Sequence, residues 1–130
     1  MTAPVDPTHT SAWSELTELH AGLDADLRAW FAGDATRTER LSFPLADLHV
    51  DLSKNLVTDD VVAALVRLAE QTGVAERYAA MLSGSHLNTS EDRAVLHTAL
   101  RRPAGSSPAL VVDGQEVDAD VRSEEHTSEL

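Results

Sequence analysis

The segment VDLSKNLVTDDVVAALVRLAEQTGV, residues 50–74, changes its hydrophobic period part-way along, and this change decides the fold class. From Leu48 to Leu52, apolar and polar residues alternate, which predicts a half-buried β-strand. The polar tripeptide at 53–55 predicts a turn, and a helical period follows it directly. We therefore expect an α+β fold that is mostly helical, with a short strand.

The helix in this segment has recognisable end signals. Thr58 is a suitable N-cap, and the carboxylates of Asp59 and Asp60 follow in the first turn, where the positive end of the helix dipole favours them. Gly73 is typical of a helix end. The expected inward stripe consists of Val61, Leu65, Leu68 and Ala69.

Upstream of the strand, the sequence predicts one long helix and one short helix. The long helix begins near Ser11 and ends at Gly33, and residues 34–41 form the short one with Asp34 as its N-cap. The long helix has an apolar stripe at steps of three and four residues: Trp13, Leu16, His20, Leu23, Leu27 and Trp30. Residues 1–10 are rich in Pro and Thr, and we expect them to be disordered.

Downstream, a further helix is expected over Val74–Leu82, with Tyr78 and Met81 facing inward. Near the end of the chain, PALVVDGQEVD at 108–118 places an Asp-Gly turn dipeptide between apolar residues, which predicts a β-hairpin.

The intervening stretch HLNTSEDRAVLHTALRR, residues 86–102, predicts another helix. Thr89 or Ser90 can supply the N-cap, two acidic residues follow in the first turn, and Pro103 prevents continuation. Capping does not explain two basic side chains in this stretch, Arg93 and His97. Being four apart, they would share one helix face and could bind an anion, or they could make buried hydrogen bonds to backbone. We favour the structural alternative.

Other candidate residues have commoner structural explanations. His49 and Asp51 lie on one side of the strand, as half of a catalytic dyad would, but solvated residues on an outer strand face are more usual. Ser53-Lys54 could cradle a phosphate, yet the glycines of a phosphate loop are missing. No HxH or HExxH arrangement occurs, and the Glu-Glu-His at 124–126 lies in a suspect tail, so we expect no metal site.

The composition limits the classes of partner. The 130 residues suffice for one domain, and 22 acidic against 10 basic residues give a formal charge of −12. This balance argues against nucleic acid and against anionic membranes, although a local pocket could still bind a small anion. The chain has no cysteine, no signal-peptide pattern and no stretch of about 20 apolar residues, so we expect a cytoplasmic protein.

The last nine residues, RSEEHTSEL at 122–130, are polar and lack any period. They also match the in-frame translation of a common sequencing-adapter oligonucleotide. We therefore expect a disordered tail of adapter origin, which is excluded from reasoning about the fold.

Three segments together resemble the N-terminal part of the glucose-6-phosphate isomerase (phosphoglucose isomerase) family. The family patterns are D-x-S-K-N and M-F-x-G-x-x-I-N-x-T-E-x-R-A-V-L-H-x-A-L-R. The segments are residues 50–74, 81–101 and 109–121. Matching residues are Asp51, Ser53, Lys54, Asn55, Met81, Gly84, Asn88, Glu91, Arg93, Ala94, Val95, Leu96, His97, Ala99, Leu100 and Arg101. The departures are conservative: Leu82, Leu87 and Ser90.

The resemblance implies a cytoplasmic, usually homodimeric enzyme of glycolysis and gluconeogenesis that interconverts glucose 6-phosphate and fructose 6-phosphate. The family moves a proton between C1 and C2 through a cis-enediol, with a glutamate base, and needs no metal or organic cofactor. A base that serves both carbons must lie within hydrogen-bond reach of each.

By the same resemblance, residues 11–121 form the N-terminal segment of the family's α/β sandwich. The family's catalytic and phosphate-binding groups lie in later segments, so we expect no catalytic, cofactor-binding or metal-binding residue in this chain and no isomerase activity from it alone. The alternative hypothesis is a stand-alone acidic helical binding module.

Overall fold

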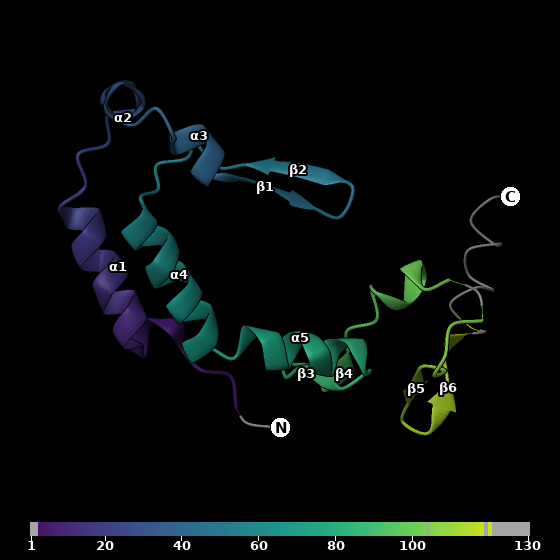
Figure 1. The fold of residues 1–130 in the computed structure, drawn as a ribbon. Helices are drawn as coiled ribbons and strands as arrows, with labels where there is room; N and C mark the ends of the chain where they lie inside the picture. The colour runs from purple at the N-terminus through teal and green to yellow at the C-terminus, as the bar shows by residue number, and fades with distance from the viewer. Residues whose placement is uncertain (1–2, 104, 119, 121–130) are drawn as a thin grey trace, which may run out of the picture. The chain divides into compact units, whose positions relative to one another are not determined.

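The helix predicted after Thr58 is α4, Asp59–Gln71, in the computed structural model, which describes residues 3–103, 105–118 and 120 (Figure 1). The Thr58 hydroxyl accepts a hydrogen bond from the Val61 N–H (3.3 Å), which confirms the predicted N-cap. Gly73 follows the helix in the left-handed conformation, with φ at 66°. The chain divides at this point into two compact units, Met1–Thr72 and Gly73–Leu130.

The first unit begins with a short 3-10 helix inside the segment expected to be disordered. The Asp6 carboxylate caps this helix by accepting from the Thr8 N–H (2.9 Å). In chain order, the elements of the unit are η1 (Pro7–His9), α1 (Ser11–Ala21), α2 (Leu27–Gly33), α3 (Arg37–Arg40), β1 (Ser42–Leu45), β2 (Leu48–Asp51) and α4.

The single long helix predicted from Ser11 to Gly33 is wrong, because the structure forms two helices there. Gly22 ends α1, donating its N–H to the Glu18 carbonyl (3.1 Å). The Asp26 carboxylate then accepts from two N–H groups of the first turn of α2 (2.9 and 3.0 Å). A capping carboxylate offers these N–H groups partners outside a continuous helix, so the break is stable.

The short helix after α2 is also displaced from its prediction. α3 begins at Arg37, and its N-cap is Thr36 rather than Asp34. The Asp34 carboxylate instead accepts from the N–H and the hydroxyl of Thr36 (2.9 and 2.7 Å), which makes a local turn ahead of the helix.

α1 and α4 pack side by side in antiparallel directions (Figure 1). Ala12 of α1 and Ala64 of α4 are both fully buried, so small side chains allow the two backbones to approach closely. The Gln71 side chain, at the end of α4, accepts from the Ala12 N–H (3.1 Å), which satisfies an otherwise unpaired donor of α1. Leu65, expected to face inward, is 46% exposed, whereas the neighbouring Ala64 is fully buried.

β1 and β2 form an antiparallel hairpin that pairs Ser42 with Asp51 and Leu45 with Leu48. The strand expected near residues 48–52 is therefore confirmed, and its partner β1 was not predicted. Half-burial is wrong for Leu48, which is 62% exposed, whereas Val50 is partly buried. In the described part of the unit, no layer covers the Leu48 side of this two-stranded sheet.

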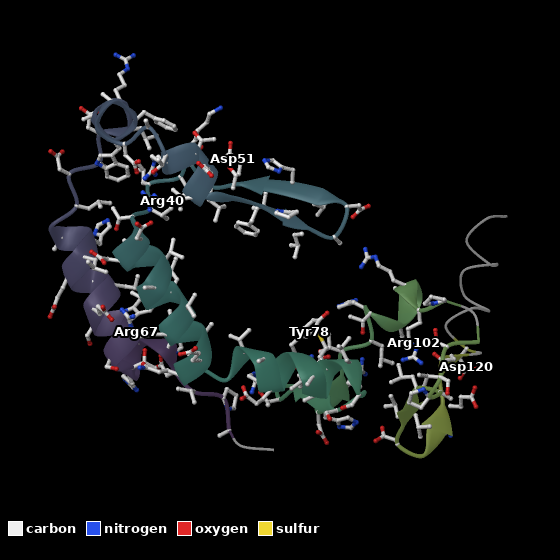
Figure 2. The ribbon with its side chains drawn as sticks, viewed as in Figure 1. Arg40, Asp51, Arg67, Tyr78, Arg102 and Asp120 are labelled. Carbon is white, nitrogen blue, oxygen red and sulfur yellow. The ribbon has the colours of Figure 1, made fainter. Side chains whose placement is uncertain are left out.

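The second unit begins with α5, Val74–Leu82, whose bounds match the prediction. Tyr78, expected to face inward, is 56% exposed and projects from the helix (Figure 2). The remaining elements are β3 (His86–Asn88), β4 (Arg93–Ala94), η2 (Ala99–Arg101), β5 (Val111–Val112) and β6 (Gln115–Glu116).

The helix predicted over residues 86–102 is wrong. The chain forms the β3–β4 hairpin there, followed by the single 3-10 turn η2. The Asn88 side-chain oxygen accepts from the N–H groups of Ser90 (3.2 Å) and Glu91 (3.4 Å), and Asp92 has a positive φ of 51°. Asn and Asp compete with helix formation in this way, and the local turn is the outcome.

The predicted hairpin around Asp113-Gly114 is confirmed. Both turn residues have positive φ values, 52° and 80°, as a type I′ turn requires, and β5 pairs antiparallel with β6. The tail at 122–130 lies outside the described residues. Helices combined with small antiparallel strand pairs give an α+β architecture, as expected.

Candidate functional site

The loop that follows β2 carries the D-x-S-K-N sequence, and Arg37 of α3 holds it. The Arg37 side chain is buried, with 5% of the residue exposed. Its Nε donates to the Ser53 carbonyl (2.8 Å), and its Nη2 donates to the carbonyls of Asn55 and Val57 (both 3.0 Å). Three backbone acceptors within five residues therefore share one guanidinium.

Aromatic side chains of α2 cover the same guanidinium. Its central carbon lies 4.9 Å from the centroid of the Trp30 ring and 5.8 Å from that of Phe31. Such cation–π contacts favour a buried cation that has been removed from water. Arg37 was not predicted as a functional residue, because an arginine inside a short helix gives no sign that its partners are distant carbonyls.

Within the loop, Asp51 and Ser53 are hydrogen-bonded to each other. The Asp51 carboxylate accepts from the Ser53 N–H (2.8 Å), and hydrogen bonding from Ser53 lowers the pKa of this carboxyl. Ser53 is buried, whereas Lys54 is exposed. The Ser53-Lys54 pair is therefore part of a structural turn, the alternative favoured from the sequence.

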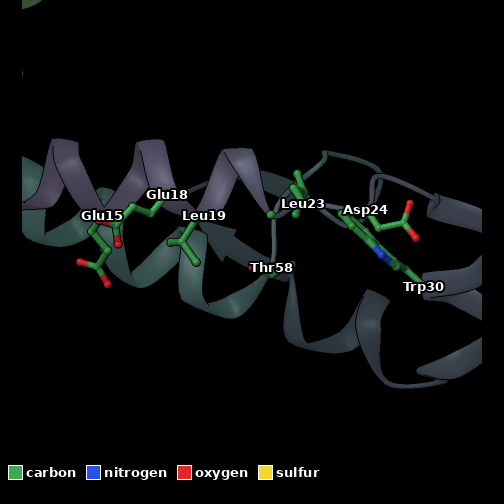
Figure 3. Close-up of a pocket in the computed structure, with 8 residues that line it drawn as sticks. Glu15, Glu18, Leu19, Leu23, Asp24, Trp30 and Thr58 are labelled. Carbon is green, nitrogen blue, oxygen red and sulfur yellow. The ribbon is translucent and has the colours of Figure 1, made fainter.

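An open groove of about 530 Å³ lies beside this anchored region (Figure 3). Trp30 and Thr58 line it from the α2 and α4 sides, and they also line an adjoining hollow of about 340 Å³ next to Arg37. The other residues that line the 530 Å³ groove are Glu15, Glu18, Leu19, Gly22, Leu23 and Asp24. The groove is thus acidic along α1, a poor environment for a phosphate group.

Ion pairs link the elements around the groove. Arg40 of α3 pairs with Asp34 (2.5 Å) and with Asp59 at the start of α4. Hydrogen bonding from Arg40 lowers the pKa of Asp34 to about 2. Arg67 of α4 reaches Glu15 of α1 through two contacts (3.1 and 2.5 Å; Figure 2). These side chains support helix placement rather than chemistry.

In the second unit, the structure does not bring Arg93 and His97 together on a helix face. Both are exposed, and Arg93 lies 4.0 Å from the carboxylate of Glu91. Neither of the two sequence hypotheses, a buried hydrogen-bonding pair or a two-residue anion site, matches this arrangement. The difference follows from the hairpin that replaces the expected helix.

The candidate dyad of the first unit is not assembled either. His49 and Asp51 are both exposed, and the Asp51 carboxylate is occupied by Ser53. Among residues 3–103, 105–118 and 120, no three side chains of His, Cys, Asp or Glu are grouped so that they could hold a metal ion. In the same part of the chain, none of the helices combines the length and the apolar character that crossing a bilayer demands.

Comparison with known proteins gives one consistent result. Residues 51–128, a range that reaches into the tail segment, match the family model described as phosphoglucose isomerase. The chain is 47% identical over 122 residues to the glucose-6-phosphate isomerase of Bifidobacterium longum (strain NCC 2705), covering 92% of this chain and 22% of that protein.

Two further relatives carry the same name. Identity is 50% over 123 residues with the protein from Corynebacterium kroppenstedtii (strain DSM 44385 / JCM 11950 / CIP 105744 / CCUG 35717), covering 93% of this chain and 22% of the relative. Identity is also 50% over 117 residues with the protein from Mycolicibacterium smegmatis, covering 89% of this chain and 21% of that relative. The chain therefore spans about a fifth of the length of the curated relatives it matches.

Proposed function

The chain belongs to the phosphoglucose isomerase family, and from this premise we propose that it forms the N-terminal segment of a glucose-6-phosphate isomerase. The enzyme interconverts glucose 6-phosphate and fructose 6-phosphate in glycolysis and gluconeogenesis. The observation that carries the proposal is identity of about half along nine-tenths of the chain to proteins of that name.

The chemistry belongs to an aldose–ketose isomerase. The sugar ring opens, and one protein base then moves a proton between C1 and C2 through a cis-enediol, without a metal or organic cofactor. A single base can serve both carbons only when substrate and base are held within hydrogen-bond distance. We place the complete enzyme in the cytoplasm as a homodimer.

This segment serves as scaffold and contributes to the family's α/β sandwich. Two observations support that role. The D-x-S-K-N loop is fastened through its backbone by Arg37, and its serine is buried in a turn. The two candidate pairs, His49 with Asp51 and Arg93 with His97, are exposed and are not assembled into a site. We therefore expect no isomerase activity from the 130 residues alone.

A chimera tests the proposal. This chain would replace the aligned 122 residues of the Bifidobacterium longum relative, and turnover of fructose 6-phosphate would be followed by coupled NADP reduction. The host strain would lack its own isomerase. We expect the chimera to be active, and both the chain alone and the relative lacking that segment to be inactive.

Two outcomes would count against the proposal. A folded but inactive chimera would show that the segment cannot serve the enzyme, which favours the acidic binding module. Turnover by the purified chain alone, above a mock purification, would refute the assignment of the catalytic groups to other segments. The source DNA downstream of codon 121 offers an independent check, since we expect it to encode the phosphate-binding and catalytic segments.

A further inference from the structure

His86 of β3 lies between two carboxylates that belong to different hairpins of the second unit. Its Nδ1 is 2.9 Å from a carboxylate oxygen of Asp92, in the turn between β3 and β4. Its Nε2 is 3.2 Å from the carboxylate of Asp113, the first residue of the β5–β6 turn. One imidazole ring therefore links both turns, and its contact with Asp113 joins residues that are 27 positions apart along the chain.

The number of donors on the ring decides whether both contacts can exist. A carboxylate only accepts hydrogen bonds, and a neutral imidazole carries one N–H. In the neutral form, one ring nitrogen would turn its lone pair toward a carboxylate. Only the imidazolium donates on both sides, so both contacts can be hydrogen bonds only when the ring is cationic.

The surroundings of the ring are acidic on both sides. Hydrogen bonds that the ring donates to the Asp92 carboxylate first, and to that of Asp113 second, raise the pKa of His86. The α5 helix packs against β3 but places no charged group that acts on the ring, and Arg93 of β4 lies beside Glu91 instead. Asp92 and Asp113 are therefore the charged groups that interact with the His86 ring.

We propose that His86 is a proton-operated clasp, which holds the β5–β6 turn against the β3–β4 hairpin when its ring is cationic and releases it when the ring is neutral. Because the folded state raises the pKa above 6.5, the clasp is complete below pH 6.5. It is lost as the pH rises through the folded value. The inference is independent of the isomerase assignment.

The Asp113→Asn substitution distinguishes the effect of the Asp113 charge on His86 from the role of Asp113 in forming the turn. Asparagine tolerates positive φ and forms a favourable type I′ turn with Gly114, so the hairpin is retained while the carboxylate is lost. If Asp113 served only the turn, this variant would leave the titration of His86 unchanged. Asp47→Asn is the matched control, because Asp47 is an exposed turn residue of the other unit.

The experiment is an NMR titration of the histidine rings in the full 130-residue chain, with backbone amide exchange measured over the same pH range. We expect the midpoint of His86 to fall in Asp113→Asn and to stay in place in Asp47→Asn. The Val117 N–H, which donates to the Leu110 carbonyl (3.0 Å), should report release of the hairpin. Corrected for its intrinsic rate, its exchange should rise about two- to fivefold above the midpoint, the effect expected of partly exposed charge pairs.

Two results would overturn the clasp. One is an unchanged His86 midpoint in Asp113→Asn, and the other is Val117 exchange in the unmodified chain without a step at the His86 midpoint. Should Asp113→Asn fail to fold, His86→Asn provides the second test. Its amide cannot become cationic, so the step in Val117 exchange should be absent, and a persisting step would refute the proposal.

Discussion

Arg37 shows how one side chain can hold a loop through hydrogen bonds to the loop's backbone. All three of its hydrogen-bond acceptors are backbone carbonyls, and two aromatic rings shield the guanidinium from water. A guanidinium can serve several acceptors because its five N–H groups form a rigid, planar fork. Lysine has no such fork, so it could not replace arginine here without loss.

Replacing Arg37 by methionine should destabilise the first unit. The variant keeps apolar bulk under Trp30 but leaves the carbonyls of Ser53, Asn55 and Val57 without their donor. We expect a loss of about 2–4 kcal/mol in the free energy of unfolding, measured by urea titration with tryptophan fluorescence. Arg28→Met, on the exposed side of α2, is the control and should cost little. Equal stability of the two variants would contradict the anchoring role.

A second prediction at the residue scale concerns Asp34 and the stability of the fold in acid. Hydrogen bonding from Arg40 lowers its pKa from 3.8 to about 2. A lowered carboxyl pKa stabilises the folded state above the unfolded value, and that stabilisation disappears as the pH falls through about 2. Asp34→Asn should therefore flatten the dependence of stability on pH between about 4 and 2, in urea titrations at each pH.

Asp47→Asn changes the net charge equally and serves as the control for Asp34→Asn. Asp47 lies in the exposed turn of the β1–β2 hairpin and should leave that acid dependence intact. If both variants behaved alike, the effect would come from overall charge and not from the pair with Arg40.

At the scale of elements, local sequence signals predicted the structure correctly wherever no distant group competes with the local interactions. The Thr58 cap, the bounds of α5 and the Asp113-Gly114 turn all depend on neighbours within a few residues, and the structure confirms each. The family signature was also recognisable in the sequence, because it lies in contiguous residues.

The predictions failed where two local structures compete or where packing decides. In residues 86–102, helix caps and turn formers are the same residue types, and Asn88 settles the competition in favour of a hairpin. Inward faces were misassigned at Leu65 and Tyr78, since a periodic stripe does not show which part of it meets a partner. The carbonyl partners of Arg37 have no side-chain signature at all.

Gly84 supplies a prediction about how α5 meets the last hairpin. A Cβ built there would lie 2.7 Å from Cγ2 of Val112, and φ is 78°. Gly105 has nearly the same φ, 77°, but nothing within 4 Å. Alanine at either position should cost about 1–2 kcal/mol for the left-handed backbone. Gly84→Ala should cost about 1–3 kcal/mol more for overpacking, measured by urea unfolding. Equal costs would show that Val112 does not press on Gly84 in solution.

At the scale of the whole molecule, the described residues bury few large side chains. The buried hydrophobic residues are Ala12, Leu41, Ala64, Ala99 and Leu110. In contrast, Leu65 and Val66 on α4 and Tyr78 and Leu82 on α5 are exposed, and exposed apolar groups of this kind mark surfaces that a partner covers. In the proposed enzyme, the sandwich to which this segment contributes would supply that cover.

The chain on its own should therefore self-associate. We expect sedimentation velocity to show a weight-average mass that rises with concentration. A double variant, Leu65→Gln with Val66→Gln, should associate less, because both side chains are already exposed and contribute little to the interior. Exposed Leu48→Gln on β2 offers a comparison at a different surface. A monomer with a sharp, dispersed amide spectrum at all concentrations would contradict this expectation.

The hold of Arg37 on carbonyl oxygens also affects how this part of the chain can change during evolution. Every amino acid supplies the same carbonyl, so point substitutions at positions 55 and 57 leave the acceptors in place, whereas the buried position 53 also restricts side-chain size. An insertion or deletion between Ser53 and Val57 would shift the alternating carbonyls out of reach of the fork. The anchor thus tolerates drift in composition but constrains the length of the loop.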